Sequence, residues 1–181
     1  MDDIVKQAMV KWPNVPHCYG WLGLDARGNW YMRDDGSQVS GAFSSGLAGA
    51  KGSLLKHEKL IDFIQRNYAC DAAGQWYFQN GPQRVYVELE ATPWVWRISD
   101  AGQIHAHDGR LAGYQRCVVD ERGWLYLETS LGFGLVHTQD VQLAADAIDA
   151  GTWTVHSAIR AQLPSSYGFV TSPQALLASK A

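Results

Sequence analysis

The sequence lacks several features by which common classes of protein are identified. It contains no run of about 18 apolar residues, and aspartates stand at positions 2 and 3, where a signal peptide carries cations. We therefore expect neither export nor insertion into a membrane. Only 18% of the residues are charged, and the 15 Lys and Arg are interspersed with 18 Asp and Glu, so no basic stripe is present. Nucleic-acid binding is accordingly not expected.

Cysteine is scarce as well, and its three positions form no recognisable pattern. Cys18, Cys70 and Cys117 are odd in number, lie far apart and stand beside Tyr, Ala or Val. Such spacing is typical neither of a disulfide framework nor of a CxxC metal site. We therefore expect reduced, buried thiols, which indicate a cytoplasmic location.

The motifs of common enzymes are also missing. Residues 41–46 have the wrong spacing for a Gly-x-Ser-x-Gly nucleophile elbow, and residues 46–53 imitate a phosphate-binding loop without its spacing. We assign no catalytic residue and no cofactor. The sequence favours a protein that is not an enzyme.

Aromatic residues, in contrast, are abundant and follow a repeated turn signature. The chain has 8 Trp, 8 Tyr and 5 Phe, and the signature Asp-x-x-Gly-x-(Trp/Leu)-Tyr occurs at residues 25–31, 71–77 and 120–126. An Asp caps such a turn with its own side chain, and Gly supplies the left-handed backbone position. We predict a β-hairpin at each signature and a further hairpin at the shorter variant, residues 100–102.

The periodicity of apolar residues predicts an α+β protein with mainly antiparallel sheets, formed by the repeated β-hairpins, and two or three helices. An arrangement as two duplicated halves is compatible with this prediction. Helices are predicted over residues 53–64, behind a Ser53 cap, over 2–11 and over 141–150. Predicted strands cover residues 21–24, 29–33, 68–70, 75–79, 84–89, 94–98, 114–119, 124–128 and 135–137.

The domain organisation is expected to follow these elements. Residues 1–66 hold the N-terminal helix, the first hairpin and the long helix, and residues 67–162 form a β-rich part with the other two hairpins and a short helix. Residues 163–181 are expected to be a flexible tail, and the Gly-rich residues 41–52 a mobile loop. One compact domain overall is the alternative.

Two predicted strands that follow each other along the chain, 84–89 and 94–98, each carry apolar residues at alternate positions. We expect the apolar faces of these two strands to pack together as core. Tyr86 and Glu88 on the opposite face are then expected to be solvated or paired across strands, and a binding surface is the alternative.

The aromatic pairs within the signatures provide the candidate binding site. Adjacent residues of a strand point to opposite faces, so Trp30 and Tyr31, or Trp76 and Tyr77, cannot both be buried on one side. One of each pair must meet solvent, a partner or a second layer, or else half of them simply fill the core. We predict a ligand pocket at a junction of the repeats. Its candidate lining residues are Trp30, Tyr31, Trp76, Tyr77, Trp124 and Tyr126.

One segment has the character of a metal site. Alternation along a strand would point His105 and His107 to one face, with Asp108 as a candidate third ligand. The alternative is a polar hairpin strand with exposed histidines.

The segment from about Gly20 to Ala150 resembles a group of small proteobacterial proteins of unknown function with repeated hairpin-plus-helix units. The resemblance rests on the turn signature, the amphipathic helix after its first copy, the strands within 86–98, and the third signature leading into residues 132–134. It implies an α+β fold with duplicated halves and, at most, a role in ligand sensing or signalling.

Residues 20–36 also resemble one unit of the aromatic hairpin repeats that bind bacterial cell walls. Those repeats recur about every 20 residues, whereas the copies here are 46 and 49 residues apart.

We interpret the chain as a non-catalytic module, of sensory or regulatory type, that binds a small molecule or a protein partner. The alternatives are a metal-dependent enzyme using His105 and His107, and a carbohydrate-binding hairpin protein. The oligomeric state is open, with a homodimer among the alternatives.

Overall fold

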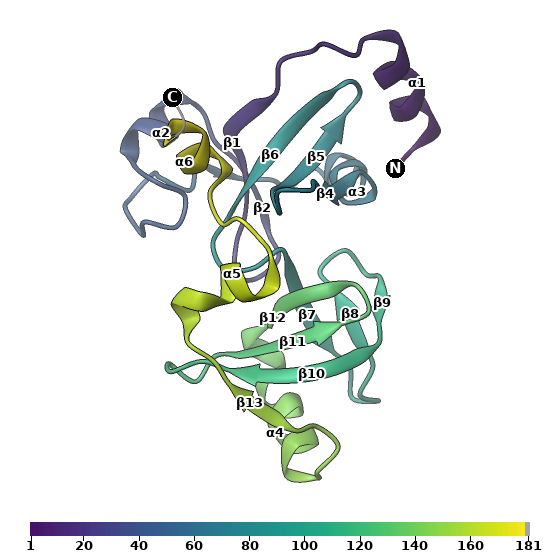
Figure 1. Ribbon diagram of the computed structural model, residues 1–181, viewed down its shortest axis with the longest axis vertical. Helices are drawn as coiled ribbons and strands as arrows, with labels where there is room; N and C mark the ends of the chain where they lie inside the picture. Colours follow the sequence, from purple (N-terminus) through teal and green to yellow (C-terminus); the bar gives the residue numbers. More distant parts are fainter. Residues whose placement is uncertain (180–181) are drawn as a thin grey trace. The chain divides into compact units, whose positions relative to one another are not determined.

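The computed structural model of the protein, which describes residues 1–179, contains two β-sheets in two units of the chain (Figure 1). Unit 1 takes in residues 1–25, 29–90 and those from 169 onward, and unit 2 takes in residues 26–28 and 91–168. The predicted α+β class with mainly antiparallel sheets is confirmed.

Sheet A of unit 1 joins two short antiparallel meanders, β1-β2-β3 and β4-β5-β6. The strands are β1 (Cys18–Leu24), β2 (Trp30–Met32), β3 (Ser53–Leu54), β4 (Tyr68–Cys70), β5 (Trp76–Asn80) and β6 (Gln83–Leu89). Their order is β3-β2-β1-β6-β5-β4. The meanders meet through parallel pairing of β1 with β6, in which Leu22 lies opposite Val87.

Sheet B of unit 2 repeats this arrangement and adds one strand. Its strands are β7 (Trp94–Ile98), β8 (Ile104–Ala106), β9 (Leu111–Ala112), β10 (Tyr114–Val119), β11 (Leu125–Thr129), β12 (Gly132–Val136) and β13 (Val155–Ser157). Their order is β13-β10-β11-β12-β7-β8-β9, and β12 pairs with β7 in parallel. The six strands from β7 to β12 are therefore ordered and paired as β1 to β6 are.

The helices are short. They are α1 (Asp3–Lys11), α2 (Asp35–Ser40), α3 (Glu58–Arg66), α4 (Val141–Asp149), α5 (Leu163–Tyr167) and α6 (Pro173–Ala178), with 3-10 turns at Thr138–Asp140 and Arg160–Gln162. The prediction that a helix begins behind Ser53 is wrong: Ser53 belongs to β3, and α3 begins at Glu58, where His57 Nδ1 accepts a hydrogen bond from the Leu60 amide. Residues 163–179, expected as a tail, contain α5 and α6.

The predicted hairpin turns are confirmed, and each is a three-residue loop with Gly at the left-handed position. At Asp25, Asp71 and Asp120, the Asp amide donates to the carbonyl of the residue four positions later at 3.0 Å, and the carboxylate accepts that residue's amide at 2.8–2.9 Å. Ser99 takes the place of Asp in the fourth turn, where its hydroxyl accepts the Gln103 amide at 3.2 Å. A fifth turn of the same form starts at Ala106, which has no capping side chain.

The connections between the meanders differ in the two sheets. In sheet B, Gly113 alone joins β9 to β10. A single residue spans about 7 Å between the flanking Cα atoms, so sheet B must curl until these two strands come together. In sheet A, residues 55–67, which contain α3, make the corresponding connection from β3 to β4.

The expected packing of residues 84–89 against 94–98 is wrong. Strand β6 lies between β1 and β5, and β7 lies between β12 and β8, so the two strands belong to different sheets. One partner of each strand, β1 for β6 and β12 for β7, comes from a distant part of the chain and leaves no trace in the local pattern.

Tyr86 and Glu88, expected to be solvated, are buried with exposed fractions of 3% and 2%. The Tyr19 ring stacks on Tyr86 with a centroid distance of 4.5 Å. The Glu88 carboxylate accepts hydrogen bonds from the Ser172 hydroxyl and the Gln174 amide at the start of α6. Burial raises the pKa of Glu88, and these hydrogen bonds and the nearby Arg33 charge oppose the effect.

Arg33 is another buried charge of unit 1, with an exposed fraction of 1%. Its guanidinium donates to the carbonyls of Ala50 at 2.8 Å, Gly41 at 2.6 Å and Gly20 at 3.2 Å. The Gly-rich segment 41–52, expected as a mobile loop, is thereby tied to β1 and β2. No helix among residues 1–179 is long and apolar enough to cross a membrane.

The Asp carboxylate is expected to stabilise each hairpin turn. Asp120 accepts hydrogen bonds from the amides of Arg122 and Trp124 and from the Tyr126 hydroxyl, all at 2.9 Å, and it is buried. Asp120→Ala leaves these donors unpaired and should lower the free energy of unfolding by about 2–4 kcal/mol in urea titrations. Asp100→Ala, at an exposed turn position without such hydrogen bonds, should change it by less than about 0.5 kcal/mol. Equal effects of the two substitutions would contradict this role.

The burial of Glu88 should make stability depend on pH. A carboxyl with a raised folded pKa contributes its full stability below its unfolded pKa, and the contribution is lost as the pH rises through the folded pKa. Glu88→Gln remains uncharged, so its free energy of unfolding minus that of the parent should rise between pH 4 and pH 8. Urea titrations across this range measure the difference. Glu58→Gln, at an exposed position, serves as the matched control substitution.

Candidate functional site

A cavity of about 280 Å³ lies in unit 1 between α3 and sheet A. Its lining residues come from β1, β2, β5, β6 and residues 55–64. The buried residues are Leu22, Ile64 and Phe78; the half-buried ones are Cys18, Leu55, Leu60, Phe63 and Val85; and the exposed ones are Trp21, Met32 and Asn80. The cavity therefore has a buried apolar floor and an exposed rim.

Helix α3 supplies one wall because its apolar residues repeat at helical spacing. Leu60, Phe63 and Ile64 fall at positions i, i+3 and i+4 and so share one face of the helix. The Phe63 ring meets the Phe78 ring of β5 edge to face, with a centroid distance of 5.4 Å and an interplanar angle of 82°.

The equivalent space in sheet B is filled by two tryptophans. Cys18 and Leu22 of β1 lie opposite Val85 and Val87 of β6, with a register shift in the pairing between them. The corresponding ladder positions of β7, opposite Gly134 and Val136 of β12, are occupied by Trp94 and Trp96. Sheet A therefore has a thiol and a leucyl side chain where sheet B has two indoles.

The two indoles are fixed by further contacts within unit 2. The Trp96 indole donates to the Leu127 carbonyl at 3.0 Å, and a Cβ at Gly134 would lie 2.5 Å from its nitrogen, so glycine is required there. The Trp94 ring lies 5.5 Å from the His107 ring and 4.7 Å from the Arg110 guanidinium carbon. The interior of sheet B is thus closed at the place where sheet A is open.

The cavity in unit 1 has an almost entirely apolar lining. The Cys18 thiol and the Asn80 amide are the side chains among the described residues that bring polar groups to it.

The six aromatic residues predicted to line a pocket are not brought together in either unit. Trp30 is buried, and its ring meets Tyr68 at 5.2 Å; Tyr68 in turn meets Trp76 at 4.7 Å. Tyr31 and Tyr77 project from the opposite face of sheet A, where Tyr77 is buried under the Arg84 guanidinium at 4.4 Å. These contacts make the four residues part of the packing of unit 1.

Trp124 and Tyr126 belong to unit 2. The Arg160 guanidinium carbon lies 4.1 Å from the Trp124 ring centroid, and Glu121 accepts the Arg160 amide at 2.8 Å. Tyr126 is buried, and burial together with its hydrogen bond to Asp120 raises the pKa of its hydroxyl. Tyr126 is thus part of the packing of unit 2, whereas Trp124 is exposed beside Arg160.

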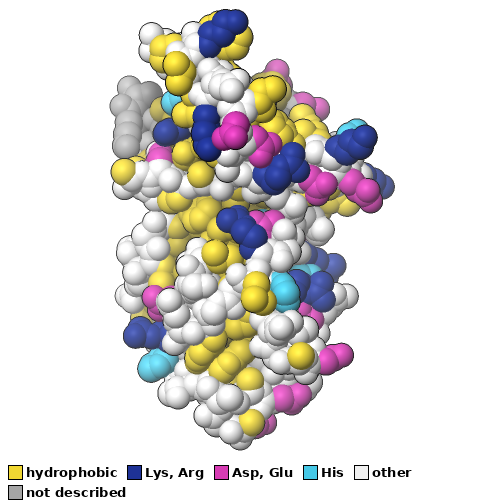
Figure 2. All heavy atoms as spheres, turned by 90° about the vertical axis from the view of Figure 1, so that its right-hand side faces the viewer, with side chains coloured by type: hydrophobic (Ala, Val, Ile, Leu, Met, Phe, Trp, Pro, Cys, Tyr) yellow, Lys and Arg dark blue, Asp and Glu magenta, His cyan; other side chains and the backbone are white. Residues whose placement is uncertain are grey.

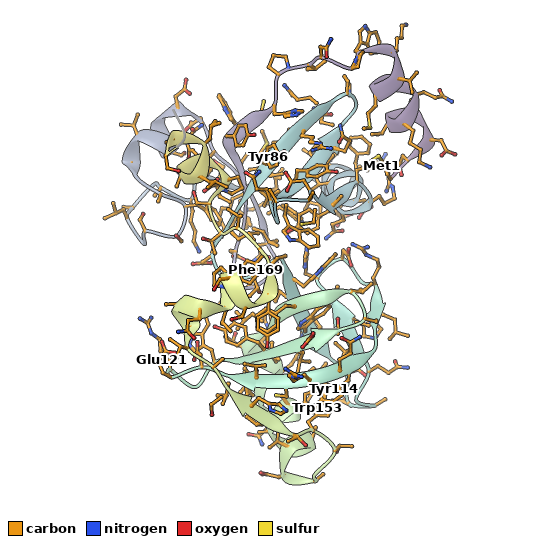
Figure 3. The ribbon with its side chains drawn as sticks, viewed as in Figure 1. Met1, Tyr86, Tyr114, Glu121, Trp153 and Phe169 are labelled. Atoms are coloured by element: carbon orange, nitrogen blue, oxygen red, sulfur yellow. The ribbon has the colours of Figure 1, made fainter. Side chains whose placement is uncertain are left out.

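Another aromatic contact of unit 2 was not anticipated. The Tyr114 and Trp153 rings, labelled in Figure 3, stack in parallel with a centroid distance of 4.9 Å. The pair connects the start of β10 to the segment between α4 and β13.

The predicted metal ligands do not share a face. Strand β8 ends at Ala106, so His105 lies on the strand, and His107 lies in the following turn. Asp108 accepts from the Arg110 amide at 3.1 Å and from its guanidinium Nε at 2.7 Å. Among residues 1–179, no group of three or more His, Cys, Asp and Glu is placed to hold a metal ion.

A second cavity, of about 420 Å³, lies in unit 2 between the turn at residues 99–102 and α4. Asp100 and Asp146 on its border are exposed.

Charged side chains of both signs are interspersed on the face drawn in Figure 2, and the net charge of the chain is −3.

The sequence contained one signal for the cavity in unit 1, namely the apolar stripe of α3. The sequence contains no signal that Cys18, Met32 and Val85 line the cavity, because these residues come together only through the pairing of β1 with β2 and with β6.

Comparisons with known proteins find similar proteins but indicate no function for the chain. No curated protein is similar enough to count as a match. A crystal structure of a DUF1285 family protein from Silicibacter pomeroyi DSS-3 is similar with a TM-score of 0.48 and 12% identity, over 74% of this chain and 72% of that one. Another, from Shewanella baltica OS155, has a TM-score of 0.45 and 13% identity, over 70% of this chain and 91% of that one.

A family profile shows to which family the chain belongs. The DUF2944 profile, described as "Protein of unknown function (DUF2946)", matches residues 1–174. The expected membership of an uncharacterised family is confirmed. The chain belongs to the DUF2944 family of proteins of unknown function.

Proposed function

We propose that the protein is a non-catalytic module that binds a small apolar molecule in the cavity under α3. One observation carries this proposal: sheets A and B have the same strand order, yet sheet A lacks the two indoles that fill sheet B. The open interior of sheet A is lined by side chains that would gain from apolar contact.

The size of the cavity supports the proposal. Ligand pockets typically enclose about 300–1,000 Å³, and an engineered apolar cavity of about 150 Å³ takes up benzene. A cavity of about 280 Å³ is thus suited to a molecule of roughly one or two rings.

The rim supports it as well. Trp21 and Met32 are 43% and 50% exposed, although both are large and apolar. Apolar surface gathered around an opening is typical of a recognition site. A bound molecule would remove part of this surface from water.

Three broader expectations join the proposal. A cytoplasmic location accords with the three cysteines, each of which is a free thiol. The shared strand order of the two sheets supports the interpretation as a duplicated unit. A sensory or regulatory role would follow if the ligand changed the binding of a protein partner.

The proposal predicts that filling the cavity abolishes ligand binding. Cys18→Trp places an indole where sheet B has Trp94, whereas the matched Cys70→Trp alters an exposed residue of β4 outside the cavity. Saturation-transfer NMR with toluene should give a signal for the parent and Cys70→Trp and at least tenfold weaker binding, by about 1.4 kcal/mol, for Cys18→Trp.

Circular dichroism and the urea midpoint check that both variants fold. Failure of the folded parent to bind toluene at millimolar concentration, or equal binding by Cys18→Trp, would contradict the proposed function.

A further inference from the structure

We propose that the cavity under α3 selects an uncharged aromatic molecule with a single hydrogen-bonding group, in preference to an alkyl chain or an ion of the same size. This inference rests on the proposed function and adds the chemical class of the ligand.

The preference for an aromatic ring follows from the side chains around the cavity. Trp21, Phe63 and Phe78 supply three aromatic rings, and Cys18 and Met32 supply two sulfur atoms. Ring pairs gain about 0.5–1.5 kcal/mol beyond the area they bury, and sulfur–ring contacts gain about 0.3–1.5 kcal/mol. An alkyl chain of equal size buries similar area but makes neither kind of contact.

The requirement for an uncharged molecule follows from the absence of a counter-charge. Among the described residues, no Asp, Glu, Lys, Arg or His borders the cavity. Two buried charges of unit 1, Arg33 and Glu88, project from the opposite face of sheet A and are committed to the 41–52 segment and to α6. A third, Asp25, accepts hydrogen bonds from Asn29 in the first hairpin turn. An ionised group drawn into the cavity would lose its hydration without gaining a partner.

The single polar group of the ligand is matched by Asn80 at the rim. Its side-chain amide offers both a donor and an acceptor and forms no hydrogen bond with another residue of the described chain. The neighbouring Gly81, with φ of +56°, fixes Asn80 at the tight turn between β5 and β6. A ligand with an N–H or O–H at one end therefore orients that end toward the rim and its ring toward the floor.

Four molecules with equal numbers of non-hydrogen atoms test this selectivity. Indole is aromatic and uncharged, 1-octanol is an uncharged alcohol with an alkyl chain, and benzoate and benzamidinium are aromatic ions of opposite sign. Each is titrated against toluene bound to the parent protein in competition NMR. Indole should bind about tenfold more tightly than each of the other three.

Two variants separate the contribution of the Asn80 amide from that of the Phe63 ring. Asn80→Leu should weaken indole binding several-fold relative to toluene binding, whereas Asn14→Leu, at an exposed asparagine outside the cavity, should change neither. Phe63→Leu should bring the affinities for indole and 1-octanol close together, and circular dichroism verifies that it folds. If that variant is unfolded, the Asn80→Leu comparison and the parent's selectivity still decide the matter.

The outcomes distinguish this inference from the proposed function. Failure of all probes, toluene included, would overturn the proposed function and this inference with it. Binding of toluene together with equal affinities for indole and 1-octanol, or tighter binding of either ion, would overturn the ligand class alone.

Discussion

The parallel pairing of β1 with β6 is the constraint on which the rest of unit 1 depends. Because this pair forms the middle of sheet A, β3 and β4 lie at opposite edges, and the chain must travel from one edge to the other. Residues 55–67 form this connection, and α3, which lies within it, buries its apolar stripe. Sheet B has the same central pairing but closes through Gly113, with no helix. The cavity thus arises from a helix-length connection over an interior that lacks the two indoles of sheet B.

The local features of the fold could be read from the sequence. The Asp and Gly residues of the three signatures specify their turns because the capping bonds join residues only four positions apart. The strands at 68–70, 94–98 and 114–119 have the predicted bounds for the same reason: alternation is a property of the strand itself. Alternation also separates Trp30 from Tyr31, since one is buried and the other half-buried.

Features that depend on distant partners could not be read in this way. Nothing near Val85 or Val87 indicates that β6 pairs with β1 rather than with β7. The prediction of binding residues therefore rests on the aromatic turn signatures, of which Trp30 packs against Tyr68 and Trp124 is exposed. Ser53 resembles a helix cap, but its pairing with Met32 overrides that preference. The sequence predicts His107 as a metal ligand, but the chain turns after Ala106 and places the His107 ring beside the Trp94 ring. In each case a long-range contact decided between two locally acceptable structures.

The path of the chain through the two units has a consequence for biosynthesis. Residues 29–90 leave the ribosome before residues 91–168, but α6, at whose start Ser172 and Gln174 donate hydrogen bonds to Glu88, is synthesised only after residue 168. Until then the Glu88 carboxylate lacks these two donors. The half of the protein that is translated first is therefore completed last, after the second half has been made.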